Sequence, residues 1–176
     1  MRRFADRRVT AAVRGTERRV VTGMRLFGRK KRQLVKLLVV EDEPLVAFDN
    51  EHALSDADYE IVATVDRASK AVALIESGAL IDLVLADVRL ADGSGVDVAR
   101  AANGRDIPVL FITGTPPDGA EDLAEGLLMK PYGSRELLGA IEVIEERRGG
   151  KTPTRLPPGF RLFARLASPP RPGAET

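Results

Sequence analysis

The sequence predicts an α/β fold in which five strands alternate with helices in a doubly wound parallel sheet. Short aliphatic runs typical of strands buried on both faces alternate with segments of helical apolar spacing. Hydrophobic residues make up 44% of the 176 residues but aromatic residues only 5%, so we expect an aliphatic core. Charged or polar residues follow four of the five runs, which is where open α/β sheets place their binding sites.

The first half of the alternation begins with an apolar strand at 35–40 and a helix that starts at Pro44, since proline suits the first helical position. The second strand is expected at 61–65, the second helix at 68–76, and the third strand at 83–86. The residues expected to form the buried stripe of the first helix are Leu45, Val46, Phe48, His52, Ala53 and Leu54.

The second half continues with a helix at about 96–102, a strand at 108–112 and a brief acidic helix near Glu121. The fifth strand is predicted at 127–129. Ser134 is expected to cap a final helix that buries four aliphatic residues, Leu137, Leu138, Ile141 and Ile144.

Charge divides the chain into three segments. Residues 1–33 carry a net charge of +10, residues 34–148 carry −13, and residues 149–176 carry +4. Basic segments with few apolar residues tend not to fold alone, and the last segment is also rich in proline. We therefore expect one folded domain at 34–148 between two disordered flanks, a basic arm (1–33) and a proline-rich tail (149–176).

The basic arm could attract nucleic acid or an anionic membrane, because clustered Lys and Arg favour both. We favour a solvated arm instead, or residues upstream of a true start at Met24, and expect nucleic acid to be no main partner. The chain has no cysteine and no apolar run long enough to span a membrane. The expected location is the cytoplasm.

Reactive side chains follow four of the predicted strands. Glu41-Asp42 follows the first, Asp87 the third, Thr113-Gly114 the fourth and Lys130-Pro131 the fifth. Taken alone, each has an ordinary explanation: an acidic helix start, a turn cap, a loop hydroxyl or a surface charge. The combination at one edge of one sheet is far more specific.

In this order, and at roughly these intervals, the segment 40–44, Asp87, Thr113 and Lys130-Pro131 resemble the receiver domain of two-component response regulators. The resemblance covers about 34–148. It implies a flavodoxin-like (βα)5 fold with strand order 2-1-3-4-5, of the CheY-like superfamily. The short interval from Thr113 to Lys130 predicts a reduced fourth helix.

The resemblance also implies the roles of the site residues. Asp87 would accept a phosphoryl group, while Lys130 and the hydroxyl of Thr113 would bind its oxygens and Gly114 would leave room for it. A Mg²⁺ ion would be held by Glu41, Asp42, Asp87 and the backbone carbonyl of Arg89. Electrostatics favour a cation independently, because a carboxylate attacks phosphorus only when the mutual repulsion is neutralised.

Three residues differ from the usual receiver pattern. Glu41 replaces an Asp, Ala91 stands where many receivers have Pro, and Leu127 stands where many carry an aromatic residue that moves on phosphorylation. Residues 111–114 with a short fourth helix resemble stand-alone receivers of the Phe-Ala-Thr-Gly ("FAT GUY") type.

Several functions remain open at this stage. We expect a receiver that takes its phosphoryl group from a sensor histidine kinase or histidine phosphotransfer protein and signals through changed affinity for a protein partner. The alternatives are a phosphorelay shuttle and a degenerate receiver that acts without phosphate. Arg89 stands where an aspartyl phosphohydrolase would carry a second Asp, so we expect no enzyme beyond slow autophosphorylation and autodephosphorylation.

Overall fold

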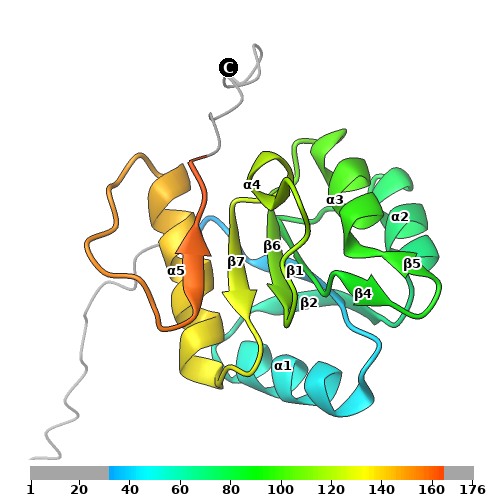
Figure 1. Ribbon diagram of the computed structural model, residues 1–176, viewed down its shortest axis with the longest axis horizontal. Coiled ribbons are helices and arrows are strands. Elements are labelled where there is room, and N and C mark those ends of the chain that lie inside the picture. Colours follow the sequence, from blue (N-terminus) through cyan, green and yellow to red (C-terminus); the bar gives the residue numbers. More distant parts are fainter. Residues whose placement is uncertain (1–31, 165–176) are drawn as a thin grey trace, which may run out of the picture. The chain divides into compact units, whose positions relative to one another are not determined.

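The computed structural model describes residues 32–164, which form a six-stranded sheet flanked by helices (Figure 1). The sheet order is β2-β1-β3-β6-β7-β8, and all neighbouring pairs are parallel except β7 with β8. The strands of the sheet are β1 (Lys36–Val40), β2 (Glu60–Val65), β3 (Leu83–Ala86), β6 (Val109–Thr113), β7 (Gly126–Met129) and β8 (Phe160–Leu162). The first five confirm the predicted parallel sheet and its order.

The helices cover both faces of the sheet. On one face, α1 (Pro44–Asp56) and α5 (Ser134–Arg148) pack on a core that includes Leu37, Leu85 and Leu110. On the other, α2 (Ala68–Glu76) and α3 (Gly95–Asn103) pack on a core that includes Leu38 and Phe111. Adjacent residues of one strand therefore enter different cores, which explains why the strand sequences are continuously apolar.

Two small elements complete the alternation. After β3, a short antiparallel hairpin joins β4 (Arg89–Leu90) to β5 (Gly93–Ser94) and leads into α3. The fourth helix of the alternation is only α4 (Ala120–Leu123), as the short interval before Lys130 predicts. No helix within residues 32–164 combines the length and the apolar character needed to cross a bilayer.

The expectation of a disordered tail from residue 149 onward is wrong for part of that segment. Residues 160–162 form β8 and pair antiparallel with β7, while Phe160 and Phe163 are buried. Proline content indicates only that the tail lacks regular structure of its own, and the edge of β7 supplies the backbone partners that order it. The basic arm up to residue 31 and the tail from residue 165 lie outside the described residues.

The predicted apolar stripe of α1 is also wrong in part. Ala53 and Leu54 are buried, but Leu45 is 80% exposed and Phe48 is 65% exposed. His52, which we expected to pack, is exposed and lies 3.6 Å from Asp56. The side chain that is buried instead is Asn50, because the hydroxyl of Tyr132 donates a hydrogen bond to its Oδ1 at 2.8 Å.

The starts of α3 and α5 show which capping residues the helices use. Ser94 caps α3 by accepting a hydrogen bond from the Val96 amide at 3.1 Å. Ser134, predicted as a cap, is instead the first residue of α5; Gly133 is the N-cap, and its amide donates to Glu136 Oε2 at 2.9 Å. Residues 130–133 therefore form the short connection from β7 to α5, and Lys130 of the predicted site is its first residue.

Candidate functional site

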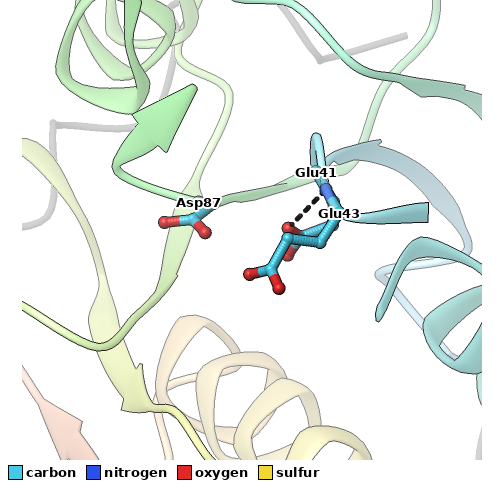
Figure 2. A group of neighbouring side chains, drawn as sticks. All are labelled: Glu41, Glu43 and Asp87. Atoms are coloured by element: carbon cyan, nitrogen blue, oxygen red, sulfur yellow. Dashed lines mark hydrogen bonds between the residues drawn. The ribbon is translucent and has the colours of Figure 1, made fainter. Parts of the chain in front are cut away.

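Three carboxylates gather at the carboxyl ends of β1 and β3, as Figure 2 shows. Glu41 and Glu43 follow β1, Asp87 follows β3, and one oxygen of each lies within 4.8 Å of the others. Because β1 and β3 are parallel neighbours, their ends meet at the same edge of the sheet. Glu41 and Asp87 are buried, whereas Glu43 is exposed.

Hydrogen bonds to the backbone orient these acids. The Arg89 amide donates to Asp87 Oδ1 at 3.1 Å, which leaves Oδ2 for a second partner. The Glu43 amide donates to Glu41 Oε1 at 3.2 Å, the bond drawn in Figure 2. Both contacts span two residues, so the turn after each strand holds its own carboxylate in place.

Lys130, at the end of β7, joins the three acids. Its Nζ lies 2.7 Å from Asp87 Oδ2, 2.8 Å from Glu41 Oε2 and 3.1 Å from Glu43 Oε1. Its side chain is only 16% exposed, so solvent screens its pairs with the buried Asp87 and Glu41 weakly, whereas the Glu43 side chain is 64% exposed. Three acids around one ammonium group leave two formal negative charges uncompensated.

The pKa values of Glu41 and Lys130 are both raised, for different reasons. Burial raises the pKa of Glu41 above its usual value, and the neighbouring Lys130 offsets only part of that effect. Burial would lower the pKa of Lys130, but its hydrogen bonds to Asp87 and Glu41 outweigh burial and raise it. Lys130 therefore stays an ammonium group at every physiological pH.

Thr113 lies at the same edge. It is the last residue of β6, it is fully buried, and its carbonyl oxygen accepts a hydrogen bond from the Lys130 amide at 3.0 Å. Its hydroxyl exchanges hydrogen bonds with the backbone of Thr115 at 3.2 Å. The structure thus brings Glu41, Asp87, Thr113 and Lys130 to one sheet edge, as the sequence predicts.

Two residues of the predicted Mg²⁺ site, Asp42 and Arg89, lie outside the three-carboxylate cluster. Asp42 is not a member of the three-carboxylate cluster found within the described residues, where Glu43 takes the third place. Arg89 begins β4, and its amide contacts Asp87 while its side chain is exposed. Our sequence reasoning did not select Glu43, although it lies two residues after Glu41 in the acidic segment that we used.

Gly95 packs closely against the backbone of Asp87, and sequence reasoning missed this role. A Cβ atom at Gly95 would lie 2.1 Å from the carbonyl oxygen of Asp87, so no side chain fits there. The Gly95 amide also donates to the Val88 carbonyl at 2.9 Å. Only glycine lets the start of α3 approach the backbone of Asp87 so closely.

A groove of about 500 Å³ runs beside the site between α1 and the loop after β7. Its lining includes Glu43, Val46, Asn50, Lys130 and Tyr132. Asn50 and Tyr132 in this lining are joined by a hydrogen bond, and burial raises the pKa of Tyr132 to about 12. The groove extends from Lys130 along α1 to His52, on which the exposed ring of Phe48 stacks.

The donor set fits a magnesium ion. Carboxylate oxygens are the ligands that Mg²⁺ prefers, and the excess of two negative charges matches a divalent cation. Glu41 and Asp87 would hold the ion, with Glu43 and Asp42 as the further acids of the segment that could reach it. The same set without a cation would repel any anionic substrate.

Comparisons with known proteins agree with this geometry. Residues 37–142 match the family described as the response regulator receiver domain. Among curated relatives, the phyllosphere-induced regulator PhyR of Methylorubrum extorquens is 34% identical over 102 residues, which cover 55% of this chain and 38% of PhyR. The sensory transduction protein RegX3 of Mycobacterium tuberculosis is 31% identical over 123 residues, covering 66% of this chain and 53% of RegX3.

Solved structures show the same fold. A response regulator receiver protein from Sinorhizobium medicae is 30% identical with a TM-score of 0.58, and the match covers 66% of this chain and 98% of that one. A CheY-like receiver domain from Methanospirillum hungatei is 25% identical with a TM-score of 0.59, with the same coverage. The curated relatives are longer than the part they share with this chain, which spans about half of their length or less.

Proposed function

Because this chain belongs to the response regulator receiver domain family, we propose that it accepts a phosphoryl group on Asp87 and signals by changed affinity for a protein partner. The observation that carries the proposal is the contact between Asp87 Oδ2 and Lys130 Nζ at 2.7 Å. It places the acceptor carboxylate beside a permanent cation, next to two further acids at the edge of the sheet.

The reaction is a transfer between two anions. An oxygen of Asp87 forms the new P–O bond while the bond from phosphorus to the donor breaks, and its electron pair leaves with the donor group. Bound Mg²⁺ would neutralise charge on the phosphoryl oxygens. Lys130 turns from Asp87 to a phosphoryl oxygen, and the Thr113 hydroxyl exchanges its Thr115 partner for another.

The donor is a phosphohistidine on a sensor kinase or a histidine phosphotransfer protein. The exposed apolar side of α1 supports a protein donor, since Leu45 and Phe48 are large, exposed and close in sequence to the acidic segment. Phe48 stacks on His52, which lines the groove together with Lys130, and Lys130 contacts Asp87. A partner seated on α1 would therefore lie close to the acceptor. Activity from small donors and self-dephosphorylation would be slow.

A second proposal concerns the downstream partner. A solved PhyR from Bartonella quintana is described as an anti-anti-sigma factor, and PhyR of Methylorubrum extorquens is among the relatives of this chain. An anti-sigma factor is therefore a candidate target, to be tested by binding with and without phosphorylation. A phosphorelay role predicts instead that the group returns to a histidine phosphotransfer protein.

The direct test is phosphorylation by acetyl phosphate or phosphoramidate, followed by intact mass in parallel for the native chain and Asp87→Asn. We expect the mass of one phosphoryl group in the native chain only, and its loss when Mg²⁺ is chelated. Asp56→Asn serves as a matched control, because it removes a carboxylate at the far end of α1 that pairs with His52 and is not in the carboxylate cluster.

The outcomes separate the alternatives. Equal addition to Asp87→Asn would move the acceptor to another residue. If the native chain takes no phosphoryl group from small donors or from phosphohistidine proteins and binds no beryllofluoride, that result would favour a degenerate receiver that acts without phosphate.

A further inference from the structure

The edge of β7 is closed by a segment of the same chain, Pro157–Phe163, which we name the C-terminal strap. β8 lies beside β7 in Figure 1 and pairs with it antiparallel from Gly126 to Leu128. Further bonds extend the ladder at both ends: the Met129 amide donates to the Gly159 carbonyl at 3.0 Å, and the Phe163 amide donates to the Glu125 carbonyl at 2.9 Å.

Apolar contacts attach the strap to both faces of the sheet. Phe160 is 5% exposed and joins the core beneath α1 and α5, while Phe163 is 8% exposed and joins the core beneath α2 and α3. Burying a phenylalanine side chain removes a large apolar surface from water and so stabilises the fold. The strap is therefore an integral part of the fold.

Two glycines receive the strap. A Cβ atom at Gly126 would lie 2.6 Å from the ring of Phe160 and 2.7 Å from the carbonyl oxygen of Arg161. A Cβ atom at Gly139 would lie 2.9 Å from the Pro157 ring. These contacts come from β7 and α5, so two separate elements are shaped for the strap.

The strap is connected to the phosphorylation site through two consecutive residues. Met129 donates its amide hydrogen to the strap, and the next residue, Lys130, donates its amide hydrogen to Thr113 on the other side. Successive amides of a strand point to opposite neighbours. The Lys130 side chain meanwhile contacts Asp87 and Glu41. A movement of Lys130 toward a phosphoryl group therefore acts on the residue directly after the one whose amide the strap binds.

We propose that the C-terminal strap is the conformational reporter of the site: a change in the partners of Lys130 weakens the Met129–Gly159 bond and detaches the strap from β7. The inference rests on the proposed function, because phosphorylation of Asp87 is what changes those partners. Detachment leaves β7 as an unpaired edge, to which another extended segment can bind through its backbone. The strap thereby couples the acceptor to a surface on the far edge of the sheet.

Amide hydrogen–deuterium exchange on the full chain tests the coupling, with intact mass on the same sample to measure phosphorylation. We expect about tenfold faster exchange over 126–129 and 157–163 on phosphorylation, while 36–40 and 83–86 stay protected. Lys130→Ala tests the same coupling without phosphate and should loosen the same two segments. Lys36→Ala is the matched control, because Lys36 pairs with Glu60 on β1 and β2 and does not contact the site.

Phe160→Ala provides the reference for a detached strap, since it removes the buried ring that faces Gly126. Phosphoryl addition without faster exchange of the strap would overturn the inference and leave the proposed function standing. If no phosphoryl group is added, the proposed function fails, and Lys130→Ala decides the coupling: unchanged exchange at 126–129 and 157–163 refutes it, and faster exchange confined there supports it.

Discussion

Lys130 Nζ lies 2.7 Å from Asp87 Oδ2 and connects the ends of two strands, β7 and β3, that are not neighbours in the sheet. The two residues are 43 positions apart in the chain. The contact makes the carboxylate proposed as the acceptor and the lysine mutually dependent: Asp87 is buried, the Lys130 side chain is only 16% exposed, and each compensates the charge of the other.

Removing the Lys130 side chain should leave phosphoryl acceptance on Asp87 but abolish the response of the C-terminal strap to it. We expect Lys130→Ala to accept a phosphoryl group more slowly, since Mg²⁺ still compensates part of the charge, and to show no further change in strap exchange once phosphorylated. Stopped reactions analysed by intact mass give the rate, and amide exchange gives the response. A native-like response in Lys130→Ala would contradict the assigned role.

Both Glu43 and Asp42 should contribute to Mg²⁺ binding. Because Glu43 belongs to the carboxylate cluster, we expect Glu43→Gln to weaken Mg²⁺ binding by about 10–100-fold, as loss of an oriented acid at a metal site does. Asp42→Ala should weaken it as well, as the family resemblance implies. Calorimetric titration measures both, with Glu60→Gln as the control, since Glu60 contacts Lys36 away from the site. An unchanged titration in Asp42→Ala would remove that residue from the metal set.

The exposed side of α1 should matter for a protein donor and not for a small one. Leu45→Ala and Phe48→Ala should slow transfer from a histidine kinase that phosphorylates the native chain, and leave phosphorylation by acetyl phosphate unchanged. Leu80→Ala is the matched control, because Leu80 is 73% exposed but lies between α2 and β3. Equal slowing by all three variants would show that α1 is no docking surface.

Gly95 should tolerate no side chain. Gly95→Ala places its Cβ against the Asp87 carbonyl, so we expect a loss of about 1–3 kcal/mol in the free energy of unfolding and a lower phosphorylation rate. Gly114→Ala is the control, because its Cβ would meet no atom within 4 Å, and its stability should change by no more than about 0.5 kcal/mol. Denaturant unfolding measures both variants. Native stability in Gly95→Ala would show that α3 can move away from Asp87.

The two tyrosines should titrate at high pH. Burial raises the pKa of Tyr59 above its usual value and that of Tyr132 to about 12. In the unfolded chain a tyrosine loses its proton at about pH 10, whereas these two keep theirs in the folded chain. The free energy of unfolding should therefore fall as the pH rises above about 10, and the tyrosines should not affect it at lower pH. Ultraviolet absorbance of tyrosinate is a clean readout, because the chain has no tryptophan.

Tyr132→Phe separates the two groups. It should remove the later titration step and cost about 1 kcal/mol through the lost hydrogen bond to Asn50. Ionisation of both tyrosines near pH 10 in the folded chain would contradict their burial.

Some expectations stay untested. The assignment to the FAT GUY group, the cytoplasmic location and the role of the basic arm remain predictions from the sequence.

Local sequence determined the strands, their order along the chain and the reactive residues at their ends. Val39 and Val40 enter different cores, so the strand pattern is continuous and easy to recognise, and Asp87, Thr113 and Lys130 each follow such a strand directly. Parallel strands bring their carboxyl ends to one edge, so this part of the site follows from the sequence pattern alone.

Only the tertiary structure decided which partners these segments find. Leu45 and Phe48 look like core residues in a helical pattern, yet the face of α1 that meets the sheet is set by Leu54 and by Asn50 paired with Tyr132. Phe160 lies in a proline-rich tail and is ordered because the edge of β7 offers unpaired backbone groups and Gly126 offers space for its ring. Such contacts join residues far apart in the chain, and no local pattern of residues encodes them.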